Sequence, residues 1–259
     1  ADRERRLELL ELLRESVERG FAGFTIHYQP QVDTVSGRLC GAEALARWHC
    51  TKYGDVSPGE FIPLMEQSGL IIPFGQWILS RGMAQCLEWC RFRPDFQISV
   101  NLSYIQLAQG DFISFLRTAL EEHSLAPSKI ILELTETYLA KAEEDTLRMI
   151  AQMKELGVKI AMDDFGVGYS SLFSLKSIPV DVVKIDRRFV KGITSDLFNA
   201  TFIRSITDLC HDVGRKVCLA GVETEEEYEA VRELGMEYIQ GYYFGRPMSA
   251  RQFEDRLKE

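Results

Sequence analysis

Short runs of β-branched and aliphatic residues alternate along the chain with longer segments of helical period. This alternation is typical of β-α-β units, in which each helix returns the chain to the start of the next parallel strand. The segments with the strand pattern are Phe24–Gln29, Cys40–Arg47, Gln97–Asn101, Ile130–Leu134, Lys159–Met162, Val182–Ile185, Val217–Ala220 and Tyr238–Gln240. The segments with helical period are Glu60–Glu66, Gln76–Arg91, Asp111–Glu122, Glu143–Leu156, Asn199–Val213 and Glu225–Leu234.

Eight strands in a chain of 259 residues predict an α/β fold closed into a TIM-like (β/α)8 barrel. The alternative is an open, doubly wound sheet. Such a sheet usually carries a glycine-rich phosphate loop after its first strand, and no such loop follows Phe24–Gln29.

A charged amphipathic segment over residues 2–19 precedes the first strand, and Gly20 is placed to end it as a helix. The chain starts with Ala1 rather than Met. We therefore interpret it as a fragment of a longer protein, in which residues 1–20 are a lead-in helix from an upstream module and residues 21–259 are the barrel.

The composition excludes several classes of protein. Hydrophobic residues make up 46% of the chain, enough for a large core, and a net charge of −9 argues against binding to a nucleic-acid polymer. No run approaches ~20 apolar residues, so we expect no membrane contact by this fragment. The six scattered cysteines contain no CxxC pair and favour free thiols in the cytoplasm. A membrane anchor elsewhere in the full-length protein stays open.

The strand ends carry the candidate chemistry. Side chains alternate between the two faces of a strand, so the last lumen-facing residues of a barrel reach its rim. Alone, each polar residue there is more often solvated or a helix cap. As a set, Glu43, Glu133, Asp163 and Asp164 would repel one another unless cations neutralise them. Ligands that offer only oxygen suit Mg²⁺ or Mn²⁺ better than zinc.

An ordered set of motifs on these strands resembles the EAL domain of bacterial cyclic di-GMP phosphodiesterases over nearly the whole chain. The tripeptide Glu43-Ala44-Leu45 alone would carry no weight, whereas the set in this order is specific. The motifs are Tyr28-Gln29-Pro30, Glu43-Ala44-Leu45-Ala46-Arg47-Trp48, Ser99-Val100-Asn101-Leu102-Ser103, Glu133-Leu134-Thr135-Glu136, Asp163-Asp164-Phe165-Gly166-Val167-Gly168-Tyr169-Ser170-Ser171, Lys184-Ile185-Asp186 and Gln240-Gly241-Tyr242.

The resemblance implies a barrel whose first strand is antiparallel to the others. It also implies hydrolysis of cyclic di-GMP to linear pGpG, supported by one or two Mg²⁺ or Mn²⁺ ions and inhibited by Ca²⁺. A homodimer that uses the loop after the fifth strand is a further implication, with the contact expected around Tyr169–Ser177. The apolar residues there would equally well pack on the barrel.

The resemblance also assigns roles to individual residues. Glu43, Asn101, Glu133 and Asp163 match metal ligands, and Asp164 matches a ligand of the second metal. Lys184 matches the residue that contacts the attacking water, and Gln240 a polar group near it, so that Lys184, Glu43, Asp163 and Gln240 form the expected catalytic set. Positions that contact the substrate are matched by Gln29, Leu45, Arg47 and Asp186. Glu136 matches a carboxylate that supports the loop Asp164–Ser171.

The chain departs from the family pattern on the seventh strand. The family sequence Ala-Glu-Gly-Val-Glu reads Leu219-Ala220-Gly221-Val222-Glu223 here, so Ala220 stands where a carboxylate is expected. A milder difference is Val167, where threonine is common. Either the protein lost the glutamate naturally or it was replaced. The function predicted is a phosphodiesterase weakened by Ala220, and the alternative is a non-catalytic cyclic di-GMP receptor that acts through a partner.

Overall fold

A computed structural model of the chain describes residues 2–108, 111–168 and 172–258. Within them a single mixed sheet has the strand order β1-β9-β8-β7-β6-β5-β4-β2-β3, and β1 also pairs with β2. All strands except the short β3 therefore close into an eight-stranded barrel, as predicted. The strands are β1 Phe24–Asp33, β2 Leu39–Cys50, β3 Gly54–Val56, β4 Gln97–Asn101, β5 Ile130–Thr135, β6 Lys159–Phe165, β7 Val182–Ile185, β8 Lys216–Ala220 and β9 Tyr238–Gln240.

The first strand runs antiparallel to both of its neighbours, β2 and β9, whereas the pairs from β2 through β4 to β9 are parallel. This confirms the expected antiparallel first strand. Gln29 lies opposite Glu43 on β2, and Gln31 lies opposite Gln240 on β9. The middle of β1 therefore stands at the same level as the carboxyl ends of the parallel strands.

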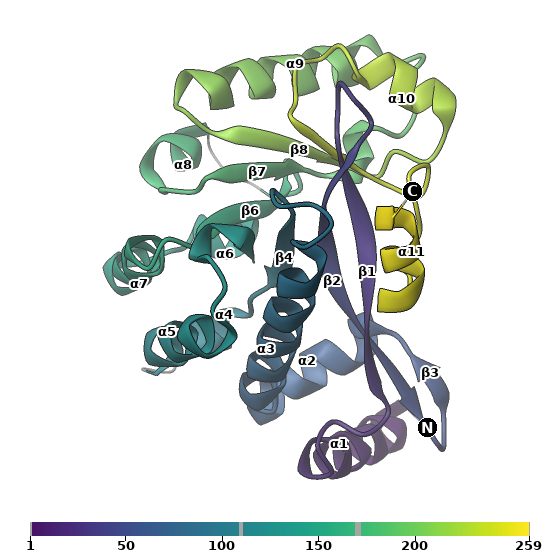
Figure 1. Ribbon diagram of the computed structural model, residues 1–259, viewed down its shortest axis with the longest axis vertical. Helices are drawn as coiled ribbons and strands as arrows, with labels where there is room; N and C mark the ends of the chain where they lie inside the picture. Colours follow the sequence, from purple (N-terminus) through teal and green to yellow (C-terminus); the bar gives the residue numbers. More distant parts are fainter. Residues whose placement is uncertain (1, 109–110, 169–171, 259) are drawn as a thin grey trace.

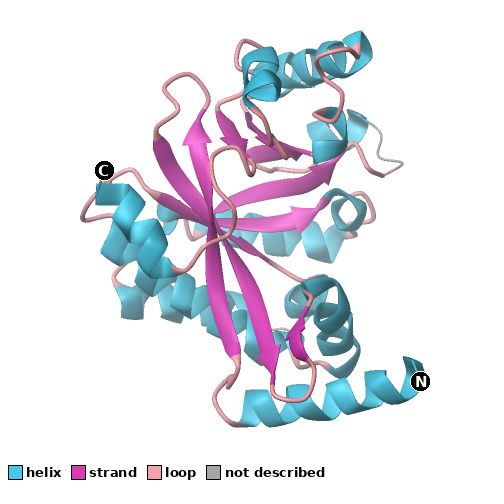
Figure 2. Ribbon diagram, turned by 90° about the vertical axis from the view of Figure 1, so that its right-hand side faces the viewer, coloured by secondary structure: helices cyan, strands magenta, loops and turns pink. Residues whose placement is uncertain are grey.

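Helices surround the barrel on its outside, where the apolar faces of the strands need cover (Figures 1 and 2). Ser57 and Pro58 begin α2, and Gly69, in the left-handed conformation with φ 76°, ends it. The helices are α1 Asp2–Glu18, α2 Pro58–Ser68, α3 Ile71–Trp89, α4 Tyr104–Ala108, α5 Phe112–His123, α6 Glu136–Leu139, α7 Glu144–Glu155, α8 Leu172–Ser177, α9 Leu197–Asp212, α10 Glu225–Val231 and α11 Ala250–Lys258, with 3-10 turns at Pro127–Lys129 and Arg187–Phe189.

The core has an outer and an inner part. The outer part lies between the sheet and the helices and contains the largest buried side chains, among them Trp48, Trp89 and Phe253. The inner part fills the base of the barrel lumen with small apolar side chains: Ile131, Ala161, Val182 and Cys218, with Tyr238 packed against them. Because this apolar base is shallow, the lumen above it is left to polar side chains.

The helix α1 packs on the rim side of the barrel, against α2 and the β2–β3 turn. Leu9 and Leu13 are 0% exposed. Arg5 Nε lies 2.7 Å from Glu60 Oε1 in α2. The helix therefore shares the main core, and its assignment to an upstream module stays a prediction.

All six cysteines are free thiols. None of the helices among the described residues is long and apolar enough to cross a membrane.

Candidate active site

The candidate residues converge at the carboxyl ends of the parallel strands. A cleft there, with about 390 Å³ of solvent space, is lined by residues from β1, β2, β6, β7, β8 and β9 and from the loops that follow them. The predicted residues in its lining are Gln29, Glu43, Asp163, Asp164, Lys184, Asp186, Ala220 and Gln240. Residues of one strand face, such as Glu43 and Lys184, reach this cleft through the alternation of side chains, whereas Asp164 and Asp186 reach it by other means.

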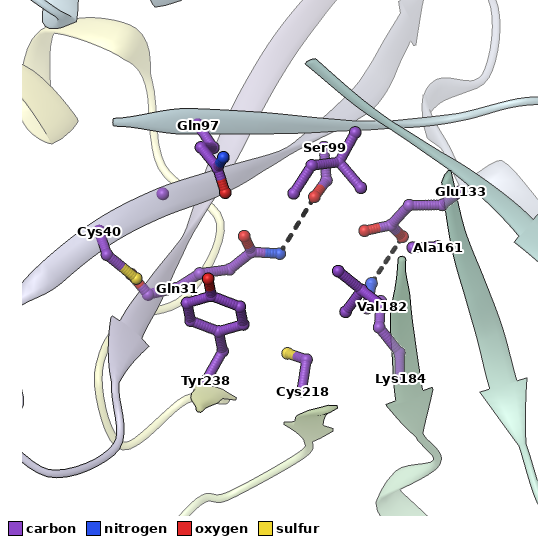
Figure 3. A pocket seen from close by; sticks show the side chains of 12 residues that line it. Gln31, Cys40, Gln97, Ser99, Glu133, Ala161, Val182, Lys184, Cys218 and Tyr238 are labelled. Carbon is purple, nitrogen blue, oxygen red and sulfur yellow. Dashed lines mark hydrogen bonds and ion pairs between the residues drawn. The ribbon is translucent and has the colours of Figure 1, made fainter. Parts of the chain in front are cut away.

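Lys184 joins the carboxyl groups of the site, and Figure 3 shows its side chain extending from β7 to Glu133. Its side chain is buried, and its Nζ donates hydrogen bonds to Glu133 Oε2 at 2.6 Å and to Glu43 Oε2 at 3.0 Å. Asp163 Oδ1 lies 3.6 Å from the same nitrogen. Since β7 is short and rich in branched residues, Val182–Ile185 holds the lysine at a fixed height in the lumen. One ammonium group thus joins carboxylates from three strands.

Glu43 receives hydrogen bonds from three directions. Besides Lys184, Asn101 Nδ2 donates to its Oε1 at 2.8 Å and Gln240 Nε2 donates to its Oε2 at 2.7 Å. Burial alone would raise the pKa of Glu43, but Lys184 and the two amides outweigh burial, and the pKa lies below its ordinary value. Three donors from three different strands therefore hold the Glu43 carboxylate in place.

Glu133 has the opposite balance. Burial, with the nearby Glu43 carboxylate, raises the pKa of Glu133 to about 8, and Lys184 offsets this only in part. Burial and then Asp163 also raise the pKa of Asp164. Burial lowers the pKa of Lys184, but the three surrounding carboxylates more than reverse this. The carboxyl groups of Glu43, Glu133 and Asp163 thus surround the single ammonium group of Lys184.

The donor set suits a divalent cation, although a direct ligand cage is not preformed. Among the described residues, no three or more His, Cys, Asp or Glu side chains are placed to hold a metal ion. The Lys184 ammonium group stands between the carboxylates of Glu43 and Glu133. However, Glu133 Oε1 is buried and has no hydrogen-bond partner among the described residues. An unpaired buried carboxylate oxygen beside further carboxyl groups fits a hard cation.

Asp163 and Asp164 lie near the end of β6, at an irregularity in the sheet. The register with β7 shifts between Met162 and Phe165, and Asp164 takes a left-handed φ of 56°. This conformation is uncommon outside glycine, and aspartate tolerates it better than most residues. Because of the shift, two successive aspartates reach one cleft, whereas a regular strand would have pointed them to opposite faces.

Glu136 supports the loop that follows β6. It is buried, and its Oε2 accepts hydrogen bonds from the backbone amides of Gly166 at 3.1 Å and Gly168 at 3.2 Å. A Cβ on Gly166 would lie 2.4 Å from the Phe189 ring, and its φ is 97°, so this position requires glycine. The geometry is that of a loop support. The expected coupling of this loop to metal binding stays a prediction.

The predicted substrate residues are divided between two clefts. Leu45 and Arg47 line a second, more apolar cleft beside α2 and α3, together with Asn101 and Glu133. Burial lowers the pKa of Arg47, against the effects of Tyr242 and Glu43. The carboxylate and lysine centre thus has one cleft on each side, an arrangement that the strand pattern alone did not indicate.

Some residues of the site were not predicted. Arg187, Arg188 and Tyr242 line the first cleft. Asp186 accepts a hydrogen bond from Arg188 N at 2.9 Å, which places the two arginines at the start of a 3-10 turn. Loop residues that follow a strand have no periodic pattern, so the sequence did not predict where their side chains point. Gln31, which is buried in the lumen, was also missed, although its spacing of two from Gln29 would have placed it there.

Ala220 lies on the rim of the first cleft and pairs with Gln240 across β8 and β9. The small side chain contributes no charge at this position. Of the predicted dimer contact around Tyr169–Ser177, residues 169–171 lie outside the described residues. Leu175, one of the apolar residues of that segment, is 1% exposed. It therefore packs on the barrel.

Comparisons with known proteins agree with the geometry. The family model described as "EAL domain" matches residues 11–247. The bifunctional diguanylate cyclase/cyclic di-GMP phosphodiesterase MucR of Pseudomonas aeruginosa is 39% identical over 97% of this chain and 37% of its own length. The cyclic di-GMP phosphodiesterase PdeR of Escherichia coli is 34% identical over 93% of this chain and 36% of its own.

A solved structure of the MucR phosphodiesterase in complex with c-di-GMP is also similar. It superposes with a TM-score of 0.88 at 39% identity, over 95% of this chain and 99% of that one. The chain spans roughly a third of the length of the curated relatives named above.

Proposed function

We propose that this chain, which belongs to the EAL domain family, binds cyclic di-GMP across its barrel rim and has the machinery to hydrolyse it to linear pGpG. The observation that carries the proposal is the buried centre at which Lys184 joins Glu43, Glu133 and Asp163 beneath an open cleft. The similar proteins named as cyclic di-GMP phosphodiesterases support the choice of substrate.

Hydrolysis adds water across one phosphodiester bond. The water oxygen bonds to phosphorus, the ester oxygen on the opposite side leaves, and that oxygen gains a proton. Negative charge builds up on the phosphate oxygens during this step, so positive charge fixed nearby lowers the barrier. Lys184 supplies such a charge from a buried position. Asp163, which is more exposed to the cleft than Glu43 or Glu133, is the carboxylate best placed to hold the attacking water.

Mg²⁺ or Mn²⁺ belongs to this proposal as the cofactor. Glu43, Asn101, Glu133 and Asp163 would hold one ion, and Asp164 a second. When bound, such ions lower the pKa of a coordinated water and neutralise phosphate charge. The carboxyl groups gathered around Lys184 and the unpaired oxygen of Glu133 support this assignment. Lys184, which now bonds to two of these carboxylates, would then be shared between carboxylates and substrate.

The two clefts suit a ligand with two nucleotide units around one reacting phosphate. Arg47 can engage phosphate or a guanine edge from the second cleft. Gln29 and Asp186 offer polar contacts in the first. An elongated pose would therefore place the reacting phosphate over Lys184 and one half of the ligand in each cleft.

Ala220 favours a second candidate, a receptor that binds cyclic di-GMP without hydrolysing it. A carboxylate at position 220 would face Gln240 at the rim and could hold a cation or a water molecule, and alanine provides neither. The first candidate explains the intact Glu43, Glu133, Asp163 and Lys184 better. In a receptor, these four residues would serve only as contacts to the ligand.

Single-turnover hydrolysis of cyclic di-GMP with Mg²⁺ separates the two candidates. We expect slow turnover by the chain and a rate higher by roughly two to three powers of ten in Ala220→Glu, since a lost positioning interaction costs on the order of 3–4 kcal/mol. Binding measured in Ca²⁺ should differ much less. Equal rates in both proteins would refute the role of position 220. Binding without hydrolysis in both would establish the receptor.

A further inference from the structure

Gln31 connects the site to the interior of the barrel. The residue lies on β1 directly opposite Gln240 on β9, and it is 7% exposed. Its Nε2 donates hydrogen bonds to Gln240 Oε1 at 3.0 Å and to Ser99 Oγ at 3.4 Å. Figure 3 shows the Gln31 side chain reaching across the lumen toward Ser99, near the Lys184–Glu133 pair.

The direction of the amides in this network follows from the carboxylate at its end. Glu43 Oε2 accepts hydrogen bonds from the Lys184 ammonium group at 3.0 Å and from Gln240 Nε2 at 2.7 Å, so the NH₂ group of Gln240 faces it. The same NH₂ group donates to Gln29 Oε1 at 3.0 Å. The carbonyl oxygen of Gln240 then points away from Glu43 and requires a donor. Gln31 supplies that donor, which completes a directed chain from Gln31 through Gln240 to Glu43, while the same Gln31 amide also donates to Ser99 Oγ.

The surroundings hold Gln31 in this orientation. Gly41, on the adjacent β2, leaves space for the Gln31 side chain: a Cβ at position 41 would lie 3.0 Å from Gln31 Oε1 and 2.9 Å from the Gln97 carbonyl oxygen. Because Gln31 is buried, its side-chain amide would be destabilised by the full free energy of desolvation if it lost its hydrogen-bond partner. Gln240 can rotate its terminal amide by half a turn at little steric cost, so a polar partner is needed to select one direction.

We propose that Gln31 is a positioning residue that sets the amide direction of Gln240 and thereby holds Glu43 in place for the reaction. This inference rests on the proposed hydrolysis of cyclic di-GMP. Gln31 lies beneath the cleft and does not line it. Its effect should therefore fall on the reaction rate rather than on ligand affinity.

Two substitutions at position 31 distinguish direction from packing. Gln31→Met keeps the length of the side chain and removes the donor. Gln31→Glu keeps the shape but offers only acceptors, so it should turn the Gln240 amide and set its carbonyl against Glu43. Gln97→Met is the matched control, because Gln97 lines the same small interior cavity but donates to Ser128 O instead. All variants are made in the Ala220→Glu background and in the chain as it stands.

We expect Gln31→Met to lower the single-turnover rate about tenfold, which corresponds to one buried hydrogen bond, and Gln31→Glu to lower it further. The dissociation constant for cyclic di-GMP should change less than about threefold, and Gln97→Met should match its parent. In a Gln240→Met background, Gln31→Met should have no further effect. Equal losses in Gln31→Met and Gln97→Met, or additive losses in the double variant, would overturn the proposal.

A readout without substrate keeps the inference separate from the proposed function. In side-chain amide NMR, the ε-NH₂ group of Gln240 should exchange slowly in the parent and in Gln97→Met, and faster in Gln31→Met. If neither parent protein hydrolyses cyclic di-GMP, the proposed function fails, yet this measurement still decides whether Gln31 holds Gln240. Unchanged exchange in Gln31→Met refutes the positioning role whatever the activity.

Discussion

Removing the central ammonium group by Lys184→Met tests the electrostatic account of the site directly. Methionine has a similar length and no charge. The substitution leaves Glu43 and Glu133 buried without the hydrogen bonds at 3.0 and 2.6 Å that they receive from Lys184. We expect the folded state to lose stability as well as activity.

The expected loss of unfolding free energy in Lys184→Met follows from the contacts that the substitution removes. Breaking a buried ion pair from one side typically costs about 3–5 kcal/mol. The lower end applies here because Glu43 keeps its hydrogen bonds from Asn101 and Gln240. For a chain of this size a loss of about 3 kcal/mol lowers the unfolding midpoint by about 6–12 °C.

The assay is thermal unfolding followed by circular dichroism, in EDTA and again with Mg²⁺ or Mn²⁺. Lys154→Met is the control, because Lys154 forms an ion pair with Asp181 at 2.8 Å on the partly exposed surface. Such pairs contribute about 0–1 kcal/mol. If a cation can replace the missing charge, the divalent ion should restore part of the stability of Lys184→Met and leave the deficit of Lys154→Met unchanged.

Two results would refute this reasoning. If Lys184→Met lost no more stability than Lys154→Met, the carboxylates would not depend on the ammonium group. If Lys184→Met lost the expected stability but gained nothing from either cation, the charge account would stand and the proposed metal site would not.

The other predictions concern metal, ligand and assembly. Asp163→Asn should abolish the stabilisation by Mg²⁺ or Mn²⁺ in thermal shift, and an equal shift in the parent and the variant would contradict its role as a ligand. Arg47→Ala should weaken cyclic di-GMP binding by about 1.5–3 kcal/mol in a calorimetric titration, the range for a charge-assisted hydrogen bond, and full-strength binding would move the ligand to another site. Light scattering should show a dimer at high concentration with ligand, and a monomer under all conditions would exclude the contact around Tyr169–Ser177.

The sequence was sufficient for the barrel and for which face each strand turns inward. Branched runs such as Val182–Ile185 mark strands, and alternation by two then places Lys184 in the lumen. Both patterns lie within a single strand, so they can be recognised without knowing which strands are its neighbours. Long helices were predicted with ends in error by a few residues: the start of α3 at Ile71 was missed because Pro73 and Gly75 interrupt its period.

What the sequence could not provide is the relation between strands. Register decides that Gln31 meets Gln240 and that Gln29 meets Glu43, and no single strand encodes it. The shift between Met162 and Phe165, which brings Asp164 beside Asp163, is likewise a property of two paired strands. Elements such as β3 and α6 have too few residues to show a period and were therefore missed.

The reversed first strand determines where the chain enters the barrel. Phe24, at the start of β1, pairs with Trp48 near the carboxyl end of β2, so the chain enters on the same side as the cleft. In an all-parallel barrel the first strand would begin at the opposite end, a full strand length away from the chemistry. Any segment joined ahead of α1 would therefore connect to the barrel through a helix that packs on α2, on the cleft side.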